Sequence, residues 1–313
     1  ISVRAPIGAM NYAKEECCIG RGLAALTPNR EKVSSDFIFW LLKGKNEELN
    51  SKGTGSTFKA IGRNILEETL VPDISLEKQI KYSIILEKTY RVILSRKQQL
   101  QKLDELVKAR FIELFGDPVY NSKRLPIQRL CKLGSLDRGR SQHRPRNDPK
   151  LLNGPYPLIQ TGEVASAGLY ITKYKNTYSE LGLRQSKMWS AGTLCITIAA
   201  NIAQTAILTF DACFPDSVVG FLPNDSINAI YMHYWFGFFQ KILEKQAPQV
   251  AQKNINLKIL SELNVIVPTQ EKQEQFAAFV EQTDKSKLAI QQSLDKLKTL
   301  RKSLMQEYYG QGE

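Results

Sequence analysis

The chain has 313 residues and a formal net charge of +12, because 43 lysines and arginines outnumber 31 aspartates and glutamates. With 42% hydrophobic residues it is not a disordered tail, and its length allows two globular domains that each bury a core. The basic surplus favours a polyanionic partner such as nucleic acid, although a merely basic soluble protein would carry the same charge. No apolar run reaches the length of a membrane span, so we expect a cytoplasmic protein.

Residues 1–72 contain alternating strand-like runs, an aromatic-rich helix around residues 37–42 and a loop of Gly, Ser and Thr. The chain begins inside an expected strand, which predicts that the front part of this first domain is missing. Residues 73–116 then form a long helix. Residues 117–268 are expected to be a complete second domain, and residues 269–313 a second long helix.

Both long helices carry an apolar stripe at helical spacing and are interrupted by neither Pro nor Gly. At 1.5 Å per residue a helix of about 38 residues spans roughly 57 Å. Each stripe predicts either an antiparallel pairing of the two helices or packing of each helix onto its own domain. The stripes consist of Leu94, Leu100, Leu103, Val107, Phe111 and Leu114 in the first helix, and Ile290, Leu294, Leu297, Leu300 and Leu304 in the second, with Leu288 at its edge.

The second domain has β-branched runs, broken by Gly and Asn, at residues 157–172 and 192–209, which predict strands and turns. Residues 227–247 predict one helix with two aromatic faces, and we expect its aromatic residues and His233 to lie in the core rather than to stack on bases.

The back half of the chain repeats the front half at an offset of about 195 residues, which indicates two copies of a domain followed by a helix. Ile1–Gly8 corresponds to Ile196–Ala203, and Cys18 corresponds to Cys213. Glu77-Lys78-Gln79 and Glu271-Lys272-Gln273 each open a long helix. A repeated module predicts a partner with two comparable sites.

The cysteines are odd in number and lie mostly beside apolar residues, so we expect reduced, buried side chains. They are Cys17, Cys18, Cys131, Cys195 and Cys213. Adjacent cysteines do not have zinc-ligand spacing and only two histidines exist, so no metal site is expected.

A segment rich in arginine, Arg138–Asn147, is the strongest candidate for binding nucleic acid. Its Gly and Pro predict a loop, from which arginines can reach guanine edges or phosphates. A solvated charge run is the alternative. The candidate residues in this segment are Arg138, Arg140, Ser141, Arg144 and Arg146, with Gln142 and Asn147 as possible readers of adenine.

Two further candidates are polar segments. Gln160 and Thr161 begin the run Gln160–Glu163, which is expected to be a polar turn after a buried strand. Lys253 and Asn254 lie in Gln249–Asn256, and Lys59 is the counterpart of this loop in the first copy. Helix capping before Leu257 is the structural alternative for the second segment.

Catalytic motifs are missing from the sequence. It has no Gly-x4-Gly-Lys-Ser/Thr phosphate loop, no Asn/Asp-Pro-Pro-aromatic tetrapeptide and no histidine placed to act as a base. The chain is therefore expected to bind rather than to catalyse.

The duplication and several ordered motifs resemble the specificity subunit of type I restriction-modification systems. The motifs in the second domain are Leu133–Ser135, Arg138–Ser141, Tyr156–Val164, Gly182–Lys187, Thr197–Ile202 and Phe214–Gly220. The resemblance covers essentially the whole chain and implies an α+β fold with two mixed α/β target-recognition domains, the first incomplete, separated by two long antiparallel coiled-coil helices.

The resemblance also implies a function. Each domain would read half of a bipartite site in double-stranded DNA, and the helices would set the gap between the halves. DNA adenine methyltransferase subunits would bring S-adenosylmethionine and ATP-dependent restriction subunits would use ATP and magnesium, whereas this chain would hold no cofactor. Two alternatives stay open: a related system with fused methyltransferase and nuclease, or a basic coiled-coil scaffold without sequence readout.

The sequence departs from the family pattern at its front. The first recognition domain lacks the counterpart of about residues 119–195 of the second, including the counterpart of Arg138–Arg146. We therefore expect residues 1–72 to expose strands that a complete domain would cover.

Overall fold

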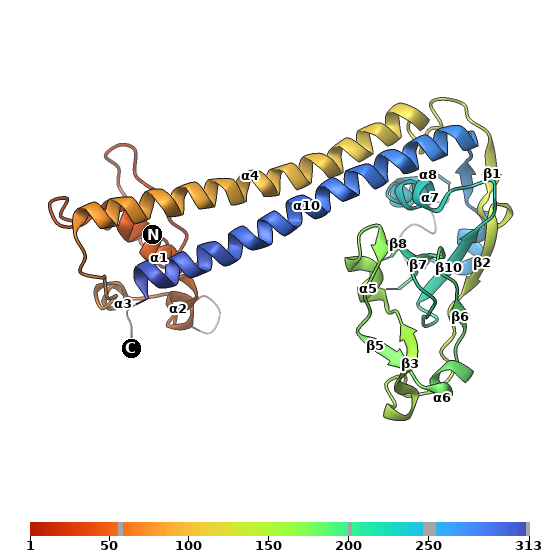
Figure 1. Cartoon of the computed structure of the whole chain (residues 1–313), viewed down its shortest axis with the longest axis horizontal. Coiled ribbons are helices and arrows are strands. Elements are labelled where there is room, and N and C mark those ends of the chain that lie inside the picture. Colours follow the sequence, from red (N-terminus) through yellow and green to blue (C-terminus); the bar gives the residue numbers. More distant parts are fainter. Residues whose placement is uncertain (56–58, 200–201, 247–254, 311–313) are drawn as a thin grey trace. The chain divides into compact units, whose positions relative to one another are not determined.

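The computed structural model describes residues 1–55, 59–199, 202–246 and 255–310, and the chain divides into two compact units. Unit 1 consists of residues 1–102 and 287–313, and unit 2 consists of residues 103–286. Two helices of 40 residues, α4 (Leu76–Phe115) and α10 (Gln270–Tyr309), contribute to both units (Figure 1). No helix in the described part of the chain is long and apolar enough to cross a membrane.

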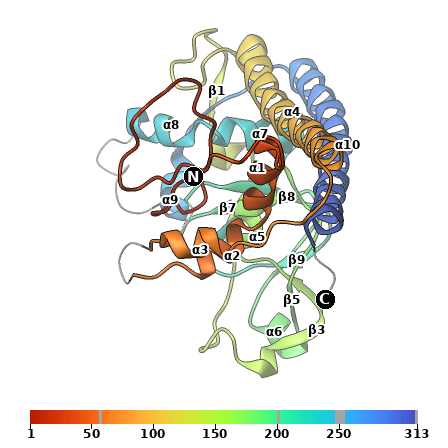
Figure 2. The ribbon, with the colours of Figure 1, turned by 90° about the vertical axis from the view of Figure 1, so that its left-hand side faces the viewer.

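Helices α4 and α10 run antiparallel within each unit, side by side in both ribbon views (Figures 1 and 2). In unit 1 the start of α4 meets the end of α10, where the rings of Tyr82 and Tyr308 stack at 3.8 Å between centroids. In unit 2 the end of α4 meets the start of α10, where Phe115 lies 5.4 Å from Phe276. Both helices also pack onto the globular part of each unit. Pairing of the helices and packing onto a domain, which the sequence offered as alternatives, therefore occur at the same time.

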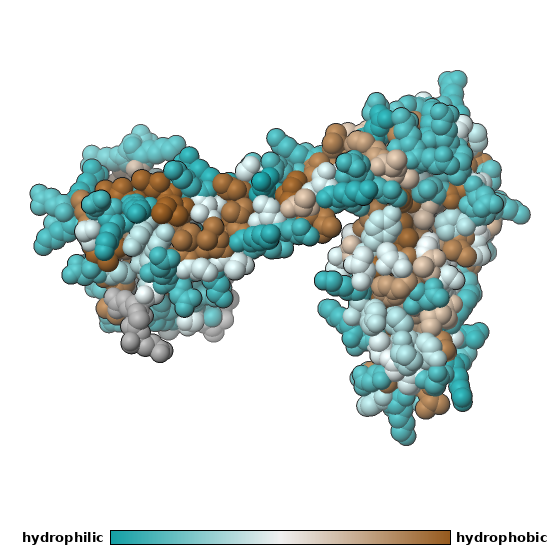
Figure 3. Space-filling model, in the orientation of Figure 1, coloured by the Kyte–Doolittle hydropathy of each residue, from teal (hydrophilic) through white to brown (hydrophobic). Residues whose placement is uncertain are grey.

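The apolar stripes are only partly buried. Val107 and Phe111 are fully covered and Leu294 is 3% exposed, whereas Leu288 and Leu300 are 61% and 49% exposed. Hydrophobic residues are visible along the helices in Figure 3. Aromatic contacts cover the two ends of the pair, and Ile93 and Leu294, near the middle of their helices, are also buried, each 3% exposed.

In its described residues, unit 1 contains three short helices, α1 (Ser35–Gly44), α2 (Asn46–Ser51) and α3 (Arg63–Glu67). Over residues 1–55 and 59–72, the expected strand-like runs form only the isolated bridges Ser2↔Leu23, Arg4↔Ala60 and Thr54↔Ala60. A strand needs a continuous ladder to persist, and within the described residues of this unit no neighbouring strand supplies one.

A groove of about 770 Å³ lies along this interrupted edge, lined by Leu23–Asn29 together with Val3, Val33, Ile38, Ile61, Arg63, Leu66 and Glu67. The bridge Ser2↔Leu23 corresponds, at the repeat offset, to the pair Thr197↔Val218 of unit 2. In unit 2 the next strand covers the equivalent edge, so Phe221 is fully buried while Leu26 is 43% exposed. Leu26 is thus exposed in this groove, whereas the equivalent edge of unit 2 is covered.

The part of unit 2 that the structure describes contains three sheets. The five-stranded sheet has the order β2-β10-β7-β8-β4, with β2 Gly134–Arg138, β10 Val218–Pro223, β7 Leu194–Thr197, β8 Thr205–Leu208 and β4 Tyr170–Ile171. The four-stranded sheet has the order β5-β3-β9-β6, with β5 Asn176–Tyr178, β3 Leu152–Leu158, β9 Ala212–Cys213 and β6 Met188–Trp189. A third pairs β1 (Ile127–Arg129) with β11 (Asn264–Ile266).

The helices of unit 2 are short apart from its shares of α4 and α10. They are α5 Thr161–Ser166, α6 Glu180–Arg184, α7 Ala229–Phe236, α8 Phe239–Gln246 and α9 Leu257–Glu262, with the 3-10 turns η1 Leu130–Lys132 and η2 Pro149–Leu151. The single helix expected at residues 227–247 is two helices, because the chain breaks after Phe236 at Gly237, which lacks a side chain to stabilise the helix.

Aromatic residues form the main core of unit 2, as expected. Tyr231 and Trp235 are fully buried, and Tyr231 packs on Phe115 with ring centroids 4.8 Å apart. His233 is half-buried at the edge of this core, with Nδ1 3.0 Å from the Thr205 hydroxyl. In unit 1, Phe37 and Trp40 are buried in the same way.

The cysteine expectation was wrong for most of the set. All five thiols are free, and Cys195 and Cys213 are buried in β7 and β9. Cys17, Cys18 and Cys131 are exposed, because they lie in loops and at a 3-10 turn rather than in a strand covered on both faces.

Candidate nucleic-acid interface

The arginine-rich segment forms a loop that leaves the edge strand β2 and packs on the loop after β9. Gly139 is buried, its N–H donates to the Val218 carbonyl at 2.9 Å, and a Cβ here would lie 2.3 Å from the Pro215 carbonyl oxygen. The Arg140 N–H donates to the Phe214 carbonyl at 3.2 Å. Only glycine allows this close approach, which fixes where the arginine side chains begin.

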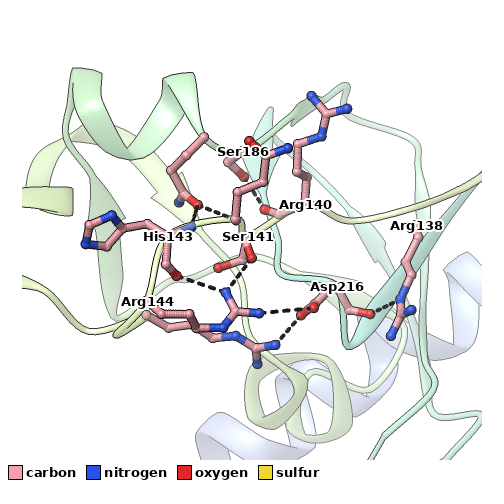
Figure 4. Close-up of polar contacts among 10 residues, drawn as sticks. Arg138, Arg140, Ser141, His143, Arg144, Ser186 and Asp216 are labelled. Carbon is pink, nitrogen blue, oxygen red and sulfur yellow. Dashed lines mark hydrogen bonds and ion pairs between the residues drawn. The ribbon is translucent and has the colours of Figure 1, made fainter.

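Asp216 lies at the centre of three of the four arginines (Figure 4). One carboxylate oxygen accepts from Arg146 Nη2 at 2.5 Å, and the other is 3.6 Å from Arg144 Nη2. The Asp216 backbone carbonyl accepts a hydrogen bond from Arg138 Nε. Arg144 also donates from Nη1 to the Ser141 and His143 carbonyls, so its guanidinium stabilises the turn of its own loop.

Arg140 differs from its neighbours. Figure 4 shows its guanidinium pointing away from Asp216. Within the part of the chain that the structure describes, this guanidinium donates no hydrogen bond and forms no ion pair. Of the four predicted arginines it is therefore the one whose donors are unengaged.

A second segment, after α6, holds the backbone of the loop. Gln185 Oε1 accepts the N–H groups of Gln142 at 2.7 Å and His143 at 3.1 Å, and the Ser186 hydroxyl donates to the Arg140 carbonyl at 3.0 Å. The loop is thus fixed from two sides although most of its side chains are exposed. Rigid mounting of this kind is what sequence readout requires.

The structure brings together predicted residues that are distant in sequence. Ser141, Arg146, Gln160 and Thr161 line one hollow of about 380 Å³ in unit 2. The other residues that line it are Asn147, Leu152, Leu158, Asn176, Tyr178, Pro215 and Ser217. Asn176 and Ser217 were not among the predicted site residues. Asn176 opens β5 and stands in no basic cluster, so no local pattern predicts it. Ser217 lies in the Phe214–Gly220 motif of the family resemblance, which assigned it no contact.

The expected polar turn at Gln160–Glu163 was wrong. These residues begin the helix α5, with Gln160 as N-cap and a reciprocal capping box with Glu163. The Gln160 N–H donates to Glu163 Oε2 at 3.2 Å. A capping box satisfies backbone groups that a turn would leave open, and it orients Thr161 on the first turn of the helix.

The remaining candidates lie elsewhere. Lys59 is exposed in unit 1, where its carbonyl accepts the Ala5 N–H at 3.1 Å. Lys253 and Asn254 lie outside the described residues. The alternative role of this second segment is seen in Asn256, whose side chain caps α9 by accepting the Ile259 N–H at 3.0 Å.

Two carboxylates beside the loop have a pKa below the ordinary value of an aspartate. A hydrogen bond from Lys187 lowers the pKa of Asp137, and the N–H of Arg138 adds to this effect. The backbone N–H of Lys150 lowers the pKa of Asp148, followed by its hydrogen bond with His143. The loop is thus a mixed field of charges rather than a uniform basic patch. Among the described residues, no three His, Cys, Asp or Glu side chains are grouped to hold a metal ion.

A family model for the type I restriction modification DNA specificity domain matches residues 1–105 and 130–299, and the chain belongs to this family. It is 44% identical over 79 residues to the MjaX specificity subunit of a type I restriction enzyme of Methanocaldococcus jannaschii, covering 25% of this chain and 19% of that one. It is 26% identical over 205 residues to the MjaIX specificity subunit of the same organism, covering 60% of this chain and 46% of that one. The chain thus spans less than half the length of these relatives.

The fold is shared with a solved structure, the S subunit of a type I restriction-modification system from M. genitalium. The TM-score is 0.64 at 15% identity, with 100% of this chain and 83% of that chain covered. The expected family and the expected α+β fold class, with mixed sheets and long helices, are therefore confirmed.

Proposed function

We propose that this chain is the non-catalytic DNA-recognition subunit of a type I restriction-modification complex, and that unit 2 reads one half of a bipartite site. The observation that supports the proposal most directly is the convergence of the Arg138–Arg146 loop with Gln160 and Thr161 around one polar hollow. Membership of the DNA specificity family supports the same assignment.

The side chains at this surface suit the reading of base edges. Arg140, whose donors are unengaged, has the fork that matches O6 and N7 of guanine. Gln160 and Asn147 carry the amide that pairs with adenine N6 and N7. The surrounding lysines and arginines would contact phosphates, which supplies affinity and position but no sequence information.

The domain organisation belongs to the proposal as well. Residues 1–72 would be the C-terminal part of a first recognition domain and residues 117–268 the complete second one. Residues 73–116 and 269–313 would be spacer helices that set the distance between half-sites and bind the methyltransferase and restriction subunits. The methyltransferase would bind S-adenosylmethionine and act on an adenine flipped out of the duplex. A cytoplasmic location is consistent with this role.

The test is a binding selection on randomised duplexes at about physiological salt, with and without the methyltransferase subunit. We expect a short motif to be enriched by the wild-type chain and to be lost in Arg140→Ala. Salt-sensitive binding without a motif under both conditions would leave a basic scaffold as the explanation. Co-purification with a fused methyltransferase-nuclease would indicate the related restriction system instead.

A further inference from the structure

We infer that Asp216 is a positioning residue for sequence discrimination: its carboxylate and carbonyl hold Arg138, Arg144 and Arg146 in fixed orientations, leaving Arg140 as the projecting reader. This inference rests on the proposed DNA-reading function of unit 2. It assigns a role to an acidic side chain at a surface where a polyanion is expected to bind, which the basic composition of the loop would not suggest.

Asp216 contacts Arg146 and Arg144 at different distances, and both contacts fix the orientation of a guanidinium group. Arg146 makes a close ion pair with Asp216, with Nη2 and Oδ1 2.5 Å apart, and it lines the hollow beside Gln160. Arg144 reaches the other carboxylate oxygen at 3.6 Å while its Nη1 bonds the Ser141 carbonyl at 2.6 Å. Two guanidinium groups repel one another, and a carboxylate between them allows both to stay close. Figure 4 shows the Arg144 guanidinium beside Asp216, joined to it by a dashed line.

Asp216 itself is mounted on a rigid support. It follows Phe214, which is fully buried and stacks on Trp189 with ring centroids 4.8 Å apart. The Val218 N–H donates to the Pro215 carbonyl at 3.0 Å and closes the turn that carries Asp216. Because the side chain is 29% exposed, the ion pairs lie at the surface and are screened by solvent. Their role is therefore orientation rather than stability.

The Asp216 carboxylate should affect the orientation of the arginines and the affinity for unrelated DNA in opposite ways. Neutralising it would release guanidinium groups that any phosphate attracts, so binding to unrelated DNA would hold or rise. The same change would remove the fixed planes that base-edge recognition requires, so discrimination would fall. A residue with a merely structural role would instead weaken binding to every duplex together.

The test compares Asp216→Asn with the wild-type chain on a selected duplex and on a shuffled duplex of equal length. Asp225→Asn is the matched control, because Asp225 is exposed on the loop after β10 and its loss changes the net charge equally. Asp216→Glu tests rescue by restoring the charge. We expect the ratio of the two affinities to fall about tenfold in Asp216→Asn, on the order of one base contact, with unchanged or tighter binding to the shuffled duplex.

The outcomes distinguish a failure of the Asp216 role from a failure of the proposed DNA-reading function. If Asp216→Asn keeps the wild-type ratio within about twofold, or weakens binding to both duplexes equally, the positioning role is wrong. An equal loss of discrimination in Asp225→Asn would assign the effect to net charge and also overturn it. If the wild-type chain shows no discrimination, the proposed function itself fails, and this inference fails with it.

Discussion

Gln79 and Gln273 make the same set of hydrogen bonds at positions 194 residues apart (273 − 79). Gln273 Oε1 accepts the N–H of Asn228, the N-cap of α7, at 2.8 Å, and its Nε2 donates to the Ser226 and Pro268 carbonyls. Gln79 does the same with Ser34, the N-cap of α1, and with the Lys32 and Ile74 carbonyls.

This pair explains why a glutamine stands third in each Glu-Lys-Gln start. One buried amide ties the first turn of a long helix to the first turn of an aromatic helix, in each unit by itself. The two side chains are 3% and 0% exposed, so their hydrogen bonds have no competing solvent.

Removing either amide should destabilise its unit. Gln273→Ala leaves the Asn228 N–H and two carbonyls without partners, which costs about 1–3 kcal/mol. Thermal unfolding measures the loss, and Gln79→Ala should show a similar one. Exposed Gln275 is the matched control, since Gln275→Ala on the same helix should leave the melting temperature nearly unchanged.

Three of the five thiols should be labelled quickly by a thiol reagent and two slowly. Cys17, Cys18 and Cys131 are exposed, and burial raises the pKa of Cys195 and Cys213. Because burial shields a thiol and disfavours its reactive thiolate form, an alkylating reagent should label the exposed thiols first and Cys195 and Cys213 much more slowly. Mass spectrometry after labelling counts the modified residues. Labelling of Cys195 in the folded chain would show that β7 is not covered as described.

The pKa of Asp137 should depend on Lys187. Its folded-state value is lowered, so the interaction contributes above the unfolded-state pKa and is lost as the pH falls through the folded value. Lys187→Gln should move the pKa of Asp137 upward toward its ordinary value. Carboxyl NMR titration from neutral pH to about pH 2 measures it. An unchanged titration would mean that the 2.8 Å contact does not persist in solution.

Arg140 and Arg144 should respond differently to truncation. Arg140→Ala removes a projecting base contact, so the ratio of the affinities for the selected and the shuffled duplex should fall about tenfold, while the slope of log affinity against log salt and the folded loop are kept. Arg144→Ala removes donors to two carbonyls of its own loop and should also increase proteolysis within residues 139–147. Arg91→Ala, on exposed α4 in unit 1, is the control. Equal discrimination between the selected and the shuffled duplex in all three variants would contradict the assignment.

The groove of unit 1 should bind a hydrophobic dye. Leu26 is 43% exposed in it, and Leu26→Gln should lower the fluorescence of bound anilinonaphthalene sulfonate. Leu222 is 40% exposed in unit 2, outside this groove, so Leu222→Gln serves as the control and should have a smaller effect. Equal effects of both changes would show that the groove is not a distinct apolar surface.

Periodicity predicted the long helices and the aromatic core, because each depends on many residues acting together, and the resemblance of the duplicated, ordered motifs predicted the family. The break at Gly237 was missed because the aromatic pattern continues across it. The capping box at Gln160 and Glu163 was missed because a six-residue helix has too few residues to show a period. The burial of Cys195 was expected, but exposed Cys131 could not be distinguished from it by apolar neighbours alone.

The sequence predicted the arginines of the candidate site but not how their side chains are arranged. Arginine density drew attention to the Arg138–Arg146 loop, but nothing in the sequence links it to Asp216, which is 70 residues beyond Arg146. The pairing of β10 with β2 and the close approach at Gly139 create that contact. Tertiary packing, which no local pattern encodes, thus decides which arginines are held and which one projects.

The central claim is that unit 2 reads DNA through this loop and its hollow. Photocrosslinking of the chain to a selected duplex carrying halogenated pyrimidines, followed by mass spectrometry, tests it most directly. We predict crosslinks within residues 138–147 and at Gln160 or Thr161, which are lost on the shuffled duplex. Crosslinks confined to residues outside this loop and hollow, or equal yields on both duplexes, would contradict the claim.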